Sequence, residues 1–159
     1  MLTAQQRQAY IATIKAFPHR LRQLVEGLSE TELTTPYLDG EWTVAQNVHH
    51  VVDSHVNSYV RLKFMLSEVN PPLRNYEQED WAKFPEAMSA DLSYSLTILD
   101  GLHQRWTLVF ENLREDEWKR TGEHSTDGPV SVESFVKSYA DHCEAHLDQI
   151  RRTLAAGTT

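Results

Sequence analysis

Cysteine and long apolar runs are almost absent from this chain of 159 residues. Cys143 is the only cysteine, so no internal disulfide can form, and a reducing compartment suits such a protein. No apolar stretch approaches the roughly 18 residues that a membrane-spanning helix needs. The first residues lack the basic and apolar zones of a secretion signal. We therefore expect a cytoplasmic protein with no membrane partner.

An excess of basic residues is also missing. The chain has 15 lysines and arginines against 23 aspartates and glutamates, a formal net charge of −8, which argues against nucleic acid as a partner. Neither a glycine-rich phosphate loop nor a GxSxG nucleophile elbow occurs. Cys143 directly follows His142, but adjacent helical residues point apart, so they cannot form a catalytic dyad. Cys143 is predicted to be a buried and inert thiol.

Helical periodicity dominates what is present. Apolar residues recur every three or four positions in four long stretches, and the length suits one hydrophobic core. We therefore predict a single all-α domain over residues 1–159, folded as a four-helix bundle. The apolar pattern of the first helix extends to Leu28, and Pro18 is expected to kink or divide this helix.

Capping signals and prolines predict where the helices begin and end. The predicted capping boxes are Thr3 with Gln6, Ser29 with Glu32, and Thr43 with Gln46. The helix that begins at Thr43 should end near Ser67, before Pro71 and Pro72. The third long helix covers about residues 89–113, residues 119–130 form a loop, and Ser131 caps the last helix. The long connections favour crossover loops, and no sheet of consequence is predicted.

His142 and His146 are the first candidate ligands of a metal ion. Residues four apart on a helix lie one turn apart on the same face. Both imidazoles could therefore bind one ion at about 2.0–2.1 Å. The pair lies in or beside the apolar stripe of the last helix, so a metal pair and a pair of hydrogen-bonded core histidines are equally good interpretations.

The segment VHHVVDSH, which ends at His55, offers a third ligand. His49 and His50 differ by about 100° in direction, so they cannot both face one site. Periodicity places His55 nearest the middle of the apolar stripe and His50 near the opposite side, alongside Asp53. The simpler interpretation of His55 is a core histidine bonded to a carbonyl or carboxylate. Spacing alone does not choose among the three histidines.

Other polar residues could act on a substrate. His103 lies on the core stripe of the third long helix. It is expected to be one of three things: a hydrogen-bond partner of a metal-binding residue, an acid–base group, or a buried structural residue. His124, in the predicted loop, is either solvated or, like His103 and Arg61, a residue that helps to bind or protonate substrate. The carboxylates that could orient imidazoles are Asp53, Asp141 and Glu144.

Three segments together resemble one protein family: TPYLDGEWTVAQNVHHVVDSHVNSYVRLK, LHQRW and YADHCEAHLDQI. They are similar to the YfiT-like branch of the DinB-like superfamily, and the likeness extends from about Thr34 to Ile150. The resemblance implies a four-helix bundle that holds one metal ion, zinc or nickel, through three histidines. The matching positions are His50, His142 and His146, so the resemblance selects His50 over His55.

The resemblance also implies an activity. Members are labelled metal-dependent hydrolases, and some are bacillithiol transferases. We expect a metal-dependent enzyme that transfers a low-molecular-weight, bacillithiol-like thiol to an electrophilic substrate. Hydrolysis by an activated water is the alternative, because three histidines leave a coordination position open for either reaction. A non-catalytic metal- or ligand-binding stress-response module is a second alternative. The resemblance further implies a homodimer.

Overall fold

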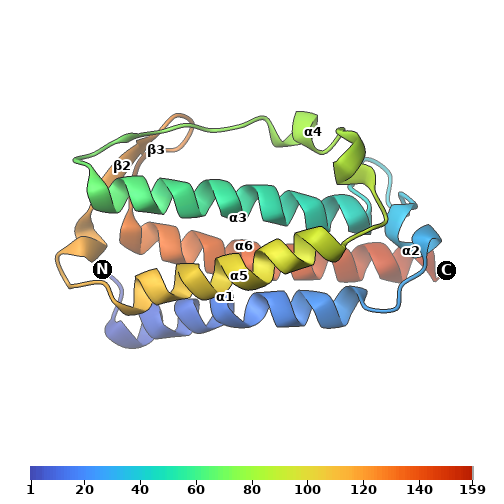
Figure 1. Ribbon diagram of the computed structural model, residues 1–159, viewed down its shortest axis with the longest axis horizontal. Helices are drawn as coiled ribbons and strands as arrows, with labels where there is room; N and C mark the ends of the chain where they lie inside the picture. The colour runs from blue at the N-terminus through green and yellow to red at the C-terminus, as the bar shows by residue number, and fades with distance from the viewer. Residues whose placement is uncertain (159) are drawn as a thin grey trace.

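Four long helices form a bundle in the computed structural model, which describes residues 1–158 (Figure 1). They are α1 (Ala4–Val25), α3 (Val44–Ser67), α5 (Ser93–Glu111) and α6 (Val132–Gly157). The shorter helices are α2 (Glu30–Thr34), α4 (Gln78–Trp81) and the 3₁₀ turns η1 (Pro85–Met88) and η2 (Glu117–Lys119). The predicted all-α four-helix bundle is confirmed.

Side-chain caps set where three of the long helices begin. All three predicted capping boxes are present, at the starts of α1, α2 and α3. At the start of α3, Thr43 Oγ1 accepts from the Gln46 N–H at 3.1 Å, and Gln46 Oε1 accepts from the Thr43 N–H at 3.0 Å. Ser131 caps α6 together with Ser134. These caps satisfy N–H groups that have no partner within the helix, and they fix the starts of the two helices that carry the histidine motifs.

The order of helix directions is up, down, down, up. Figure 1 shows α1 and α6 running one way and α3 and α5 running the other. Because α3 and α5 run in the same direction, the chain must return along the bundle between them. Residues 68–92, which include β1, α4 and η1, make this return over α3 (Figure 1). The predicted long crossover is therefore present, and the two ends of the chain lie at opposite ends of the bundle.

The core is formed by the inner faces of the four long helices. The largest fully buried apolar side chains are Trp106, Phe17, Phe110, Ile14, Leu21, Leu62, Met65, Leu73, Leu99, Leu147 and Ile150. His55 is buried as completely as these residues. Cys143 is also fully buried, as predicted, and its burial raises the pKa of its thiol. Among residues 1–158, no helix combines the length and apolarity needed to cross a bilayer.

Two predictions about the connections are wrong. Residues 119–130 are not a plain loop, because β2 (Thr121–His124) and β3 (Gly128–Ser131) pair as an antiparallel hairpin, and β1 (Pro72–Leu73) joins β2 in parallel. Gly122 allows this close approach, since a Cβ there would lie 2.7 Å from Leu73 Cδ1. The helix expected from about residue 89 begins at Ser93, because η1 and the turn after it occupy the preceding residues.

Pro18 does not divide the first helix. α1 continues from Ala4 to Val25 with Pro18 inside it and buried, and it ends three residues before Leu28. Proline lacks the N–H that would bond to the carbonyl of Ile14, four residues earlier. That carbonyl accepts a hydrogen bond from His103 Nδ1 of α5 instead, at 2.6 Å. The missing helical bond is thus replaced by a bond between two helices.

Asp53 is expected to make the protein less stable at neutral pH than at acidic pH. Burial and then the charge of Glu86 raise the pKa of this α3 carboxyl from 3.8 to about 6. A pKa raised on folding contributes stability below the unfolded value, and this contribution is lost as the pH rises through about 6. We expect Asp53→Asn to increase the free energy of unfolding by about 1–2 kcal/mol at pH 7.5, after allowance for partial solvent exposure, with almost no gain at pH 4.

Urea denaturation at the two pH values measures this difference. Asp148→Asn, on the exposed side of α6, is the control and should show no comparable gain. Equal gains for Asp53→Asn at both pH values would contradict the proposed cause.

Candidate metal centre

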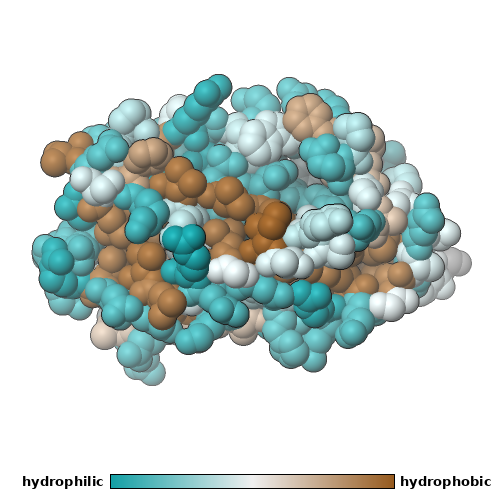
Figure 2. All heavy atoms as spheres, in the orientation of Figure 1, coloured by the Kyte–Doolittle hydropathy of each residue, from teal (hydrophilic) through white to brown (hydrophobic). Residues whose placement is uncertain are grey.

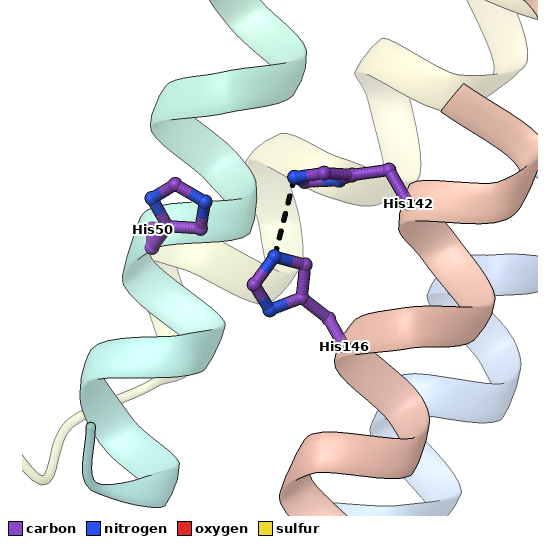
Figure 3. Close-up of side chains that lie close together, drawn as sticks. All are labelled: His50, His142 and His146. Carbon is purple, nitrogen blue, oxygen red and sulfur yellow. Dashed lines mark hydrogen bonds between the residues drawn. The ribbon is translucent and has the colours of Figure 1, made fainter. Parts of the chain in front are cut away.

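Three histidines from two helices meet between α3 and α6. His50 projects from α3, while His142 and His146 project from successive turns of α6 toward it (Figure 3). One nitrogen from each ring can be chosen so that all three lie within 4.8 Å of one another. His142 Nε2 and His146 Nε2 are 3.2 Å apart. The spacing of four residues on α6 therefore does bring both imidazoles to one place.

Burial keeps these imidazoles neutral. It lowers the pKa of His50 to about 3 and that of His146 to about 4. Burial, followed by repulsion from the other two rings, places the pKa of His142 well below its usual value. A neutral imidazole carries the lone pair that binds a metal, so the cluster has ligands in the correct form at neutral pH.

An asparagine orients His146. Asn47, one turn before His50 on α3, is fully buried, and its Oδ1 lies 2.9 Å from His146 Nδ1. An amide oxygen can only accept, so His146 Nδ1 carries the proton and its Nε2 is free for a metal. Asn47 Nδ2 donates to the carbonyl of Thr43 at 3.0 Å, which holds the amide in this orientation. Asn47 thus occupies the position that a carboxylate or carbonyl has behind many metal-binding histidines.

A second histidine orients His142. His55 Nε2 lies 3.1 Å from His142 Nδ1, and His55 Nδ1 lies 2.8 Å from His103 Nε2. Periodicity was therefore right that His55 points inward, and it remains outside the three-histidine cluster. The partner expected for His55, a carbonyl or carboxylate, was wrong, because both partners are imidazoles.

The helical-wheel placement of His50 was wrong. His50 is only 5% exposed and packs against the Trp42 ring, with ring centroids 4.5 Å apart. The wheel assumes one buried stripe, whereas α3 is covered by α5, α6 and the crossover together, so it has several buried faces. His49 faces Ser95 of α5, with His49 Nδ1 2.7 Å from Ser95 Oγ. Adjacent histidines do diverge: His49 has a buried partner in Ser95, whereas His50 packs against the half-buried Trp42.

Two cavities reach the cluster, and His142 lines both of them. The first, of about 370 Å³, is lined by all three histidines together with Trp42, Glu41 and Glu79. The second, of about 270 Å³, lies on the other side of His142. Its polar lining includes Arg61, Tyr76, His124, Ser54 and Asn75. The cluster is therefore accessible to small molecules from two directions.

Two of the three candidate catalytic residues lie in the second cavity. Arg61 of α3 donates from Nε and Nη2 to the carbonyl of Arg74, at 3.0 and 2.6 Å. His124 at the end of β2 is 8% exposed, so the interpretation as a solvated loop residue is wrong. His103 lies in the core, is 1% exposed and lines neither cavity, so the structure gives it no direct contact with a substrate there.

The carboxylates expected to orient the imidazoles do not do so. Asp141 bonds to Lys137, and Glu144 pairs with Arg20, both on the exposed side of α6. Asn47 and His55 take this role, and sequence reasoning missed Asn47 entirely. Its spacing of three residues before His50 was the available signal, because that spacing puts both residues on one face of α3. Tyr76 was also missed, since only the crossover places it in the second cavity.

The donor set fits a divalent metal ion. Three neutral imidazole nitrogens converge, at least two of them are oriented by hydrogen bonds from behind, and open space adjoins them. A zinc site with three protein ligands and one open position is the arrangement of catalytic rather than structural centres.

Residues 13–150 match the DinB superfamily. The chain belongs to this superfamily. A Bacillus subtilis (strain 168) protein, YfiT, provisionally named as a metal-dependent hydrolase, is 37% identical over 150 residues, which cover 94% of this chain and 84% of YfiT. A Bacillus cereus (strain G9842) protein with the same provisional function is 36% identical over 156 residues, 96% of this chain and 90% of its own length.

Solved structures agree with this membership. The structure of Bacillus subtilis YfiT, described as a probable metal-dependent hydrolase with an unusual four-helix bundle topology, superposes with a TM-score of 0.93. That match has 36% identity and covers 96% of this chain and 88% of the other. A mycothiol-dependent maleylpyruvate isomerase, at 15% identity and a TM-score of 0.61, covers 94% of this chain and 63% of its own. It shares the fold.

We expect the wild-type protein to bind one divalent ion per chain. Replacing His50, His142 or His146 by alanine should remove most bound metal, because each supplies one of three nitrogens. Elemental analysis after dialysis against zinc or nickel measures the stoichiometry. His19→Ala, on the exposed face of α1, is the control and should retain full occupancy. Full occupancy in His50→Ala with loss in His55→Ala would show that the wrong α3 histidine was assigned.

Proposed function

We propose that this protein is a metal-dependent enzyme that transfers a low-molecular-weight thiol to an electrophile. The ion, zinc or nickel, would bind to His50, His142 and His146. The observation that carries the proposal is that three convergent, neutral histidines open onto two cavities. A metal site that adjoins space for small molecules suits catalysis better than storage, which argues against a non-catalytic binding module.

A divalent ion held by three neutral ligands would keep its full charge and so favour a thiolate over a thiol. The ordinary thiol pKa of about 8.5 leaves only a few per cent of the molecules ionised at pH 7. The protein's own Cys143 is unsuitable as the nucleophile, because it is fully buried and lines neither cavity among the described residues. The thiol must therefore come from solution, and its bacillithiol-like character follows the likeness to the YfiT-like family.

The second cavity supplies groups that can hold the reacting molecules. Arg61 is always positively charged, and its guanidinium is fixed by the Arg74 carbonyl, so it can pair with an anionic group. Burial raises the pKa of Tyr76 to about 12, so its hydroxyl remains protonated and can donate a hydrogen bond. His124 Nδ1 lies 3.1 Å from Asp127 Oδ2, which orients its ring beside the same cavity. A thiol bearing a carboxylate would match this lining.

Hydrolysis is the second candidate, and Glu41 favours it. This carboxylate lines the cavity that contains all three histidines. Its Oε1 accepts from Arg152 at 3.1 Å, whereas its buried Oε2 has no hydrogen-bond partner among the described residues. A free carboxylate oxygen beside a metal centre could accept a proton from an attacking water.

Thiol conjugation separates the two activities. We expect a panel of thiols that includes bacillithiol to react with a haloarene faster in the presence of the metal-loaded protein. Chelation or His142→Ala should abolish the catalysed rate, because each removes the metal centre. Cys143→Ala should retain it. Metal-dependent ester or amide cleavage, without conjugation of any thiol and lost in Glu41→Gln, would assign the protein to the hydrolases instead.

We also propose that the protein is a homodimer that associates through α3 and α5. Figure 2 shows apolar side chains gathered on the face that these helices form. The exposed members on α3 are Val56, Val60 and Phe64, and those on α5 are Tyr94, Ile98 and Leu108. Gly101 lies among the α5 residues, and a Cβ there would meet nothing within 4 Å, so a second helix could approach closely. A second copy of the same face is the occupant that such an exposed apolar surface suits.

Sedimentation tests the dimer. We expect the wild-type protein to sediment at twice the chain mass of 18.3 kDa. Val60→Glu and Ile98→Glu should each shift it toward monomer, because a charge would be buried between the copies. Val69→Glu, an exposed apolar residue beyond the end of α3, is the control and should remain dimeric. A wild-type monomer at micromolar concentration would contradict this proposal and leave the metal chemistry unaffected.

A further inference from the structure

One unbroken line of hydrogen bonds connects the histidine cluster with the opposite side of the bundle. From α6, His142 Nδ1 lies 3.1 Å from His55 Nε2 on α3. His55 Nδ1 lies 2.8 Å from His103 Nε2 on α5. His103 Nδ1 lies 2.6 Å from the Ile14 carbonyl oxygen on α1. The line therefore passes through all four long helices, and His55 and His103 each use both of their nitrogens.

The carbonyl at the end gives this line a direction. A carbonyl oxygen can only accept, so His103 Nδ1 must carry a proton. A neutral imidazole has one N–H, so His103 Nε2 must accept from His55 Nδ1. By the same step, His55 Nε2 accepts from His142 Nδ1. His142 Nε2 then has no proton, and this is the nitrogen that lies 3.2 Å from His146 Nε2 in the cluster.

Pro18 explains why the Ile14 carbonyl is available. In an α-helix this oxygen would accept from the N–H of residue 18, but proline has none. Pro18 lies inside α1, where proline is unfavourable for the helix itself. The free carbonyl faces a core in which His103 is 1% exposed, so no water competes for it. An unfavourable helical residue thus creates the acceptor on which the line ends.

The direction of these hydrogen bonds requires that His55 and His103 are neutral, and the surrounding apolar core keeps both rings in that form. Phe17 packs against both inner rings, with centroids 5.5 Å from those of His55 and of His103. Trp106 packs against the same two rings from another side. The other groups that contact the two rings among the described residues are the histidine neighbours and Tyr139. Burial lowers the pKa of His103 to about 4, and it outweighs the charge of Asp100, three residues before His103 on α5, which acts to raise that pKa.

We propose that Pro18, His103 and His55 are positioning residues that hold His142 in the Nδ1–H tautomer, with its Nε2 lone pair preset for the metal. The expected effect on metal affinity rests on the proposed function, in which the histidine cluster binds a metal ion. The tautomers themselves do not depend on metal binding. His142 thereby resembles His146, whose tautomer is set by Asn47. The hydrogen bonds that support His142 differ in that they extend through three further helices, α3, α5 and α1.

The first test is nitrogen-15 NMR of the histidine side chains in the metal-free protein. We expect His103, His55 and His142 to be neutral Nδ1–H tautomers, with Nδ1 protons that exchange slowly because they are hydrogen-bonded in the core. A merely space-filling histidine would not show this pattern. A protonated Nε2 on His103 would overturn the proposal.

The second test is zinc affinity, measured by competition with a chelating dye. His55→Leu should weaken zinc binding by about 10–100-fold, the usual loss when a residue that supports a ligand is removed. His103→Leu should weaken it less, since His55 remains beside His142. His49→Leu is the matched control, because it removes a buried histidine of α3 that bonds to Ser95 and lies outside the line. Equal affinity in His55→Leu and His49→Leu would overturn the proposal.

Pro18→Ala distinguishes positioning from general damage. Alanine restores the helical N–H, so the melting temperature should rise or remain unchanged, while zinc affinity falls because that N–H competes for the Ile14 carbonyl. In the His103→Leu background, Pro18→Ala should cause no further loss of affinity. Undiminished affinity in Pro18→Ala would exclude Pro18 from the line.

Metal binding and the tautomer of His142 are tested independently of each other. If the wild-type protein binds no zinc, the proposed function fails, while the NMR experiment still decides whether the line sets the tautomer of His142.

Discussion

The structure depends on pairing the imidazoles that are buried where its four long helices meet. A buried polar group without a partner costs about 1–3 kcal/mol, and His103, His55 and His142 would each incur that cost among the surrounding aromatic rings. They avoid it by bonding to one another and finally to the carbonyl of Ile14. Because every bond crosses from one helix to another, these contacts constrain how the helices can be placed relative to one another.

The order of helix directions supports this arrangement. α3 and α5 run in the same direction, so positions about two turns farther along one helix meet positions about two turns farther along the other. His49 meets Ser95, and His55 meets His103 farther along. The crossover that this topology requires then lies over α3 and supplies cavity walls. Tyr76 lines the second cavity, while Gln78 lines both cavities that reach the cluster. The parallel orientation of α3 and α5 therefore requires the crossover, and the crossover in turn supplies walls of the two cavities.

The centre is built from neutral groups in an otherwise acidic protein. Its formal net charge is −8, yet the nearest partners of the three histidines are an asparagine, another histidine and a tryptophan ring. Two carboxylates of α6, Asp141 and Glu144, are engaged by Lys137 and Arg20 at the surface. Glu41 and Glu79 line the cavity beside the histidines but are not members of the three-histidine cluster. An ion bound to such ligands would remain strongly electrophilic, because no ligand offsets its charge. This is the physical basis for expecting activation of a thiol or of water.

The starts of the capped helices α1, α3 and α6, the inward direction of His55 and the chelating spacing of His142 and His146 could be predicted from the sequence, because each depends on neighbours within two turns. The resemblance, and not periodicity, selected His50. Only the tertiary structure decided the remaining features: the several buried faces of α3, the hairpin that buries His124, and the role of Asn47. The same is true of Pro18, which looked like an interruption of α1. Because Pro18 has no N–H, the Ile14 carbonyl is left free, and it gains a partner only when α5 brings His103 to it. That hydrogen bond joins residues 89 positions apart.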